Sequence, residues 1–247
     1  MRLSVTGWRV ANAGAPEPRG LPLGLIEQNN LREVGMIFLK RLFVSVLLIA
    51  SSTAFGQETS SSAILMPKSG TYSRTISVAD TAAQQFFDQG LRFAWGFYFP
   101  ESIASYQEAS RLAPDHPMPF WGIAHAAGPN PNSRYAQMPD DPQGAGLKAI
   151  KAALARIDRA TAMEASLIKA LFVFYDAESI PDPRERDQAY LAAMRSLNEQ
   201  YPDDPDIAAL YAGSFMSIRR WDYWDKNGDA KGETLAVAEA LEHVINT

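Results

Sequence analysis

The spacing of small and aromatic residues between Phe86 and Pro114 constrains this chain more than any other feature. The pattern consists of Gly90, Phe93, Ser102, Tyr106, Ala109 and Pro114. Small residues followed by aromatics, closed by a proline, are typical of a two-helix unit of about 34 residues that recurs along a chain. One such unit cannot bury its apolar faces alone, so neighbouring units must stack on it. The pattern therefore predicts an all-α chain built of stacked helix pairs.

Similar signals recur further along the chain. The run PDHPMPFWGIA (114–124) is echoed by PDDPDIAALYA (202–212). Between them, Thr161 and Glu164 form a T-x-x-E capping box, in which the threonine caps the third helical amide and the glutamate reaches back. We expect a helical array over 79–247 with about four helix–turn–helix repeats. These repeats are placed at about 83–116, 117–158, 161–202 and 204–247.

The first 56 residues are typical of export rather than of a folded domain. Met36–Arg41 is short and basic, the run LFVSVLLIA (42–50) is apolar, and Ala54–Gly56 offers small residues for cleavage. This order predicts a secretory signal peptide, because the apolar run is shorter than the roughly 20 residues that cross a bilayer. A membrane anchor and a disordered tail on a cytosolic protein are the alternatives.

The signal peptide organises the rest of the N-terminal region. We expect a spurious or disordered leader at 1–35, a signal peptide at Met36–Gly56 and a linker at 57–78. Residues 63–76 of this linker are expected to be extended. Cleavage after Gly56 would leave no stable membrane span and would place the protein in the periplasm or outside the cell.

The composition excludes several chemistries. The formal net charge of −5 disfavours a nucleic-acid partner, because phosphate binding needs a basic face. The chain has no cysteine, so disulfides, thiolate metal sites and a cysteine nucleophile are ruled out. Its three histidines are too few for a histidine-rich metal centre. No G-x-S-x-G, H-E-x-x-H or phosphate-loop motif is present. We therefore expect neither a cofactor nor a bound metal.

Longer stretches carry a family resemblance. They are FDQGL (87–91), PESIASYQEASRLAPDHP (100–117), FWGIAHAAGPNPN (120–132), YPDDPDIAALYAGSF (201–215) and WDYWDKNG (221–228). Over roughly 80–247 the chain resembles exported bacterial tetratricopeptide (TPR) repeat proteins of unknown biochemical role. The resemblance implies a TPR-like α-solenoid and matches the N-terminal portion of such proteins. It carries no catalytic residue over to this chain, because the family has no established catalytic residue to match.

The second repeat contains the best candidates for partner contacts. Trp121 follows the expected core residue Phe120 and should look towards the concave face of the array. His125 lies one helical turn further on, beside a loop that contains Asn130 and Asn132. A contact of these four residues with a partner is the functional interpretation. A solvent-facing or core histidine, and a core-filling tryptophan, are the structural interpretations.

The run from Trp221 to Asp229 contains further candidates, Trp221 and Trp224. Asp225, Asn227 and Asp229 alternate like the first ligands of a calcium loop. An EF-hand also needs glycine at its sixth position and glutamate at its twelfth, and alanines stand there. We therefore expect an Asn-Gly turn between helices, which Trp221 and Trp224 pack onto the array, with a calcium site of another geometry as the alternative.

Three functions remain open from the sequence. A non-enzymatic scaffold whose groove binds a protein or peptide fits best, since stacked helical repeats form extended concave binding surfaces. A metal-dependent hydrolase or other enzyme would use His125 with carboxylates such as Asp222 or Asp225. A non-autonomous fragment of a longer TPR protein is the third, because 233–246 predicts a last helix whose apolar face has no later repeat to cover it. Sequence alone indicates neither the partner nor the oligomeric state.

Overall fold

The computed structural model describes residues 63–133 and 137–246, and within them every regular element is a helix. The expected signal peptide and leader lie outside the described residues. The helices are α2 (Thr81–Trp95), α3 (Phe99–Leu112), α4 (Pro117–Ala127), α5 (Pro142–Leu154), α6 (Ala162–Tyr175), α7 (Pro183–Gln200), α8 (Pro205–Arg219) and α9 (Thr234–Asn246). A short 3₁₀ turn, Ile157–Arg159, precedes α6. The all-α prediction is confirmed for this part of the chain.

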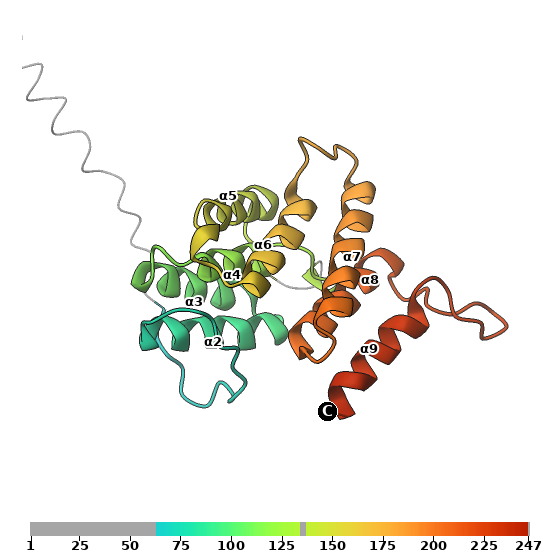
Figure 1. Cartoon of the computed structure of the whole chain (residues 1–247), viewed down its shortest axis with the longest axis horizontal. Coiled ribbons are helices and arrows are strands. Elements are labelled where there is room, and N and C mark those ends of the chain that lie inside the picture. Colours follow the sequence, from blue (N-terminus) through green and yellow to red (C-terminus); the bar gives the residue numbers. More distant parts are fainter. Residues whose placement is uncertain (1–62, 134–136, 247) are drawn as a thin grey trace, which may run out of the picture. The chain divides into compact units, whose positions relative to one another are not determined.

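The helices pack in the order of the sequence (Figure 1). Each helix lies against the next one, and α4 also contacts α2 and α6 across the helices between them. None of the helices in the described ranges is both long and apolar enough to cross a bilayer. Contacts between helices that are neighbours in the sequence dominate the packing.

Most helices begin at a residue whose side chain caps the first turn. Asp141, Asp182 and Asp204 each accept a hydrogen bond from a backbone amide of the helix that follows, and each precedes a proline. Proline suits the first helical turn, where its missing N–H has no partner to lose. The predicted capping box is confirmed, because Thr161 and Glu164 exchange both of its hydrogen bonds. The residues that start these helices are therefore close neighbours in the sequence.

The side chain of Tyr106, on α3, packs against both α2 and α4. It is fully buried and lies against Gly90 of α2 and Gly122 of α4. A Cβ atom at Gly90 would lie 2.8 Å from the tyrosine ring, and one at Gly122 would overlap the ring. The two glycines thus let three helices approach around one aromatic side chain. This explains the small and aromatic spacing from which the fold was predicted.

A second tyrosine closes the next junction in a similar way. Tyr175, at the end of α6, occupies space that a Cβ atom at Gly128 or Gly146 would invade. Its hydroxyl donates a 2.6 Å hydrogen bond to the backbone carbonyl of Ala124. Ala124 lies in the last turn of α4, which ends at Ala127. The tyrosine therefore satisfies one of the carbonyl groups that a helix end leaves without a partner. α4, α5 and α6 are fixed together at this point.

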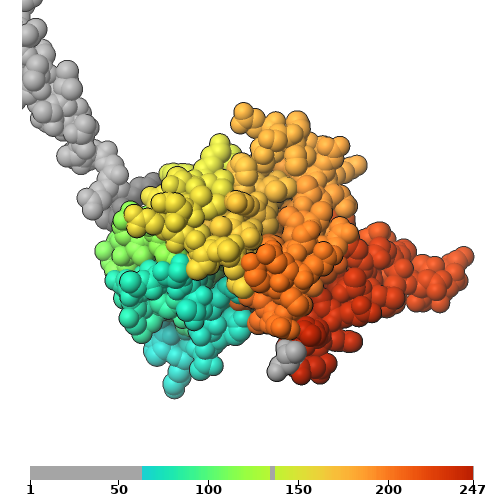
Figure 2. Space-filling view, in the orientation of Figure 1, coloured from blue at the N-terminus to red at the C-terminus, as the bar shows by residue number. Residues whose placement is uncertain are grey.

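The last helix packs on α8 through one side only. Val237 is buried and Leu241 contacts the core, whereas Leu235 and Ile245 are exposed. The loop between α8 and α9 projects from the helices in the space-filling view (Figure 2). The expected apolar face of this helix is therefore covered in part by α8.

Candidate ligand-binding cavity

A cavity of about 220 Å³ lies where α2, α4, α8 and α9 come together. It brings together His125, Asn130 and Asn132, three of the side chains predicted to bind a partner. The remaining walls are largely apolar and come from Trp95, Phe97, Leu210, Met216 and Leu241. Ligand sites usually combine such apolar walls with a few polar groups. This cavity is therefore the candidate functional site.

His125 is the central polar side chain of the cavity wall. Its ring stacks on Trp121, with centroids 5.2 Å apart and planes 2° from parallel, and the edge of Trp95 meets it at 5.7 Å. The residue is 2 % exposed, and its Nδ1 has no hydrogen-bond partner in the described part of the chain. Burial lowers the pKa of His125 to about 4, because desolvation disfavours the charged imidazolium. The imidazole is therefore neutral at pH 7.

The placement predicted for Trp121 needs correction. We expected its indole on an open concave face, but the side chain is 2 % exposed and belongs to the hydrophobic core. Phe120 is the partly exposed member of the pair, and the Arg156 guanidinium lies 4.4 Å from the centre of its ring. The residue of α4 that points into the core is thus Trp121, one position after the expected Phe120. Trp121 positions His125 by stacking and does not offer a surface of its own.

The two asparagines belong to the loop after α4. Asn130 donates from Nδ2 to the backbone carbonyl of His125 over 3.0 Å, and its own amide donates to Gly128. This pair of contacts folds the loop back onto the end of α4. Asn132 lines the same cavity. The loop therefore carries polar groups to the cavity mouth.

The opposite wall is formed by α8, which sequence reasoning did not connect with His125. Gly213 lines the cavity, and a Cβ atom placed on it would meet no heavy atom of a neighbouring element within 4 Å. Glycine in a helix interior costs about 1 kcal/mol relative to alanine. Here it leaves open space in the wall of the cavity that His125 also lines. No local sequence signal pairs α4 with a helix that begins nearly 80 residues after α4 ends.

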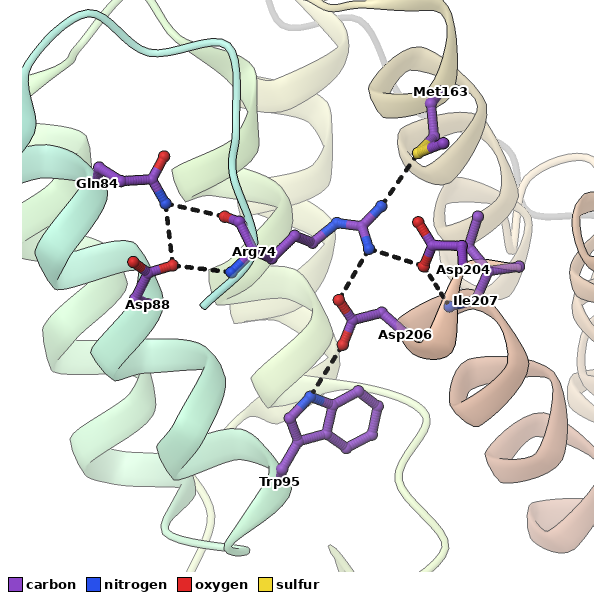
Figure 3. Close-up of polar contacts among 8 residues, drawn as sticks. All are labelled: Arg74, Gln84, Asp88, Trp95, Met163, Asp204, Asp206 and Ile207. Atoms are coloured by element: carbon purple, nitrogen blue, oxygen red, sulfur yellow. Dashed lines mark hydrogen bonds and ion pairs between the residues drawn. The ribbon is translucent and has the colours of Figure 1, made fainter. Parts of the chain in front are cut away.

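Trp95 links the cavity to a polar cluster at the start of α8. Its indole Nε1 donates to Oδ1 of Asp206 over 3.3 Å (Figure 3). The same ring also contacts the ring of His125. Asp206 also accepts a 2.8 Å ion pair from Arg74. Hydrogen bonds to Asp204 and Asp206 outweigh the effect of burial and raise the pKa of Arg74. The C-terminal end of α2 and the start of α8 are thus held next to each other.

The other two predicted contact residues lie elsewhere. Trp221 and Trp224 are exposed on the α8–α9 loop and do not line the cavity. In that loop the Asp225 carboxylate accepts hydrogen bonds from the amides of Asn227 and Asp229. These bonds form the predicted turn. The expectation that Trp221 and Trp224 pack this turn onto the helices is wrong, because both side chains are exposed and Tyr223 packs against the core in their place. Within the described residues, no three histidine or acidic side chains group as metal ligands would.

A serine, a histidine and a glutamate meet at the start of α4, but their hydrogen bonds run in the wrong direction for a nucleophile. His116 Nδ1 accepts from the amide of Met118, so its proton lies on Nε2, which contacts Ser77 Oγ at 2.9 Å. Ser77 in turn donates to Glu164 over 2.7 Å. A nucleophilic serine must give its proton to the imidazole. This cluster instead fixes Ser77 against α6.

We expect the stability of the protein to fall in mild acid because of His125. The pKa of His125 in the folded protein is about 4, whereas that of a histidine in the unfolded chain is about 6.5. As the pH falls, the unfolded state therefore binds the proton before the folded state does. The free energy of unfolding should drop by about 2 kcal/mol between pH 7 and pH 5. Urea unfolding at both pH values measures this difference. Equal pH dependence in wild type and His125→Phe would contradict the assignment.

The cavity is better suited to binding than to catalysis. A neutral imidazole with an unmet hydrogen bond can hold a polar group, and the apolar walls can hold an aliphatic or aromatic group.

Comparison with protein-family models, with curated proteins and with solved structures finds no match to this chain.

Proposed function

We propose that this chain is a non-enzymatic binding protein, exported to the periplasm or beyond, whose helix pairs form a TPR-like solenoid. Its cavity receives an apolar side chain from a protein or peptide partner, and His125 meets a polar group beside it. The pairing of each helix with the next supports the repeat architecture. The predicted signal peptide supports export.

One observation carries the binding proposal. An imidazole that is almost fully buried, with Nδ1 unpartnered among the described residues, lines a cavity whose walls are mostly apolar. A buried polar atom without a partner costs about 1–3 kcal/mol. A ligand that supplies the missing hydrogen bond removes this cost and gains affinity from it.

The hydrolase alternative has weaker support from the same site. A general base works best with a pKa near the operating pH, whereas the pKa of His125 is about 4. Burial is the cause of that shift, with no carboxylate acting on the ring. Asp222 and Asp225, the expected partners of such an enzyme, lie on the α8–α9 loop and do not line the cavity. Binding is therefore the better proposal.

Filling the cavity is the direct test of this function. Peptides are selected from a displayed random library on the wild-type protein, and their affinities are measured by calorimetry. The variant Gly213→Leu places a side chain in the open space of the cavity. We expect it to bind selected peptides at least about tenfold more weakly, which corresponds to about 1.4 kcal/mol.

The matched control is Gln107→Leu, which adds the same side chain to an exposed position of α3. It should leave peptide affinity unchanged. Both variants should retain the wild-type helical circular dichroism spectrum. Selected peptides that bind Gly213→Leu as tightly as wild type would place their site elsewhere and reject the proposal for this cavity.

A further inference from the structure

Residues 64–77, which we call the strap, lie against the helices as two extended stretches on either side of a turn near Lys68, so the expectation of an extended segment over 63–76 holds only in part. The strap contains no helix or strand. It runs beside α2 and reaches the first turns of α6 and α8 through its polar contacts. Part of it lies at the surface in Figure 2, in the colours of the start of the described chain. Its mode of attachment is that of a bound peptide.

The helices hold the strap mainly by its backbone. Gln89 accepts from the Met66 amide over 2.7 Å and donates to the Ile64 carbonyl over 2.9 Å. Gln84 makes the same pair of contacts further along the strap. It accepts from the Ile76 amide over 3.0 Å and donates to the Arg74 carbonyl over 2.8 Å. These contacts recognise an extended main chain and not a particular side chain.

Two acidic side chains complete the backbone contacts. Asp88 accepts from the Arg74 amide over 3.0 Å, and Glu164 accepts from the Ser77 amide over 2.8 Å. Burial alone would raise the pKa of Glu164, but hydrogen bonds from Ser77 and Thr161 outweigh it and lower that pKa. The helices thus present a row of side-chain acceptors and donors that matches an extended peptide.

Arg74 and Ile76 are the strap side chains that the helices bury most deeply, and Ser77 adds hydrogen bonds of its hydroxyl group with Glu164 and His116. Arg74 reaches Asp204 and Asp206 at 2.8 Å each and contacts the Met163 sulfur at 3.2 Å (Figure 3). Ile76 is 4 % exposed, whereas Ile64 is 75 % exposed. An arginine and an aliphatic residue two positions later therefore provide the buried part of the side-chain recognition.

We infer that this surface is a peptide-binding track, which the strap occupies as an intramolecular ligand. The track consists of Gln84, Asp88, Gln89, Glu164, Asp204 and Asp206. Its partner is an extended peptide segment with the order Arg-x-Ile or a close aliphatic equivalent. This inference does not depend on the cavity function, because none of the six track residues lines that cavity.

The strap is an effective competitor because it is tethered to α2. A short tether gives a local concentration of about millimolar, so a peptide added to the wild-type protein must displace a well-supplied ligand. A weakened strap should open the track to peptides in trans. Arg74 is the residue to replace. Lysine at this position keeps the positive charge but loses the planar guanidinium that contacts both aspartates.

The test measures trans binding with a fluorescein-labelled peptide of residues 71–79, TYSRTISVA. Fluorescence anisotropy compares the full-length wild type with full-length Arg74→Lys and Arg74→Ala. Both variants should bind the peptide at least about tenfold more tightly than wild type, because their own strap competes less. The same peptide with its arginine replaced by alanine should lose at least about tenfold in affinity for each variant.

Arg74→Lys keeps the test decisive if Arg74→Ala fails to fold, because its charge can still pair with Asp204 and Asp206. A control variant, Arg111→Lys, alters an exposed arginine paired with Glu108 outside the track. It should bind the peptide no better than wild type. If folded Arg74→Lys binds the peptide no better than wild type, or binds the alanine peptide equally well, the track is not an arginine-dependent peptide site.

Discussion

Replacing Trp121 with alanine should lower the free energy of unfolding by about 3–5 kcal/mol, the usual cost of removing a buried tryptophan from a core. The indole is 2 % exposed and stacks on His125, so its loss leaves a void beside the cavity. Chemical denaturation of purified protein measures the change. Any loss of partner binding by Trp121→Ala would then follow from lost structure.

Trp221→Ala is the matched control, because it removes the same side chain from a position that is 69 % exposed. It should change the free energy of unfolding by no more than about 0.5 kcal/mol, as is usual for surface positions. If the two tryptophan variants were equally stable, Trp121 would lie outside the core and the inward register of α4 would be wrong.

Replacing Gly122 with valine should destabilise the protein by at least about 3 kcal/mol, at the upper end for an overpacked core. A Cβ atom at this position overlaps the ring of Tyr106, and Gly90 also lies against that ring. The melting temperature and the urea midpoint should both fall. Tyr106→Leu in the same chain should recover part of the loss, since it removes the overlapping ring.

Gly213→Val is the control for this prediction. It makes the same substitution in a helix, but its new side chain enters open space. The protein should keep its stability or gain a few tenths of a kcal/mol, because valine has a better helix propensity than glycine. A Gly122→Val protein as stable as Gly213→Val would show that the α2–α3–α4 junction is not closed around Tyr106.

The features that sequence predicted are the ones decided by near neighbours in the chain. The capping box at Thr161 needs only Glu164, three residues away, and the predicted box is confirmed. Aspartates before prolines mark the starts of α5, α7 and α8 in the same local way. The spacing of Gly90 and Tyr106 reports a contact between adjacent helices. Such local signals suffice for an all-α prediction.

The features that sequence missed depend on distant contacts. Phe120 and Trp121 are both apolar, so the sequence could not decide which one faces inward. His125 meets Trp95 of α2, and its cavity is closed by residues of α8. Arg74 pairs with aspartates 130 and 132 positions later. A residue's own neighbourhood contains no information about such partners, so the cavity and the strap had to be seen in the structure.

The central claim is that a ligand in the cavity meets the His125 imidazole, and histidine nitrogen NMR tests it most directly. The chain has three histidines, so a long-range ¹H–¹⁵N spectrum of the rings is simple, and His125→Phe assigns the signal by its loss. Titration with a library-selected peptide should shift the ring nitrogens of His125 while the His243 signals stay in place. A peptide that binds stoichiometrically without moving the His125 signals would contradict the account.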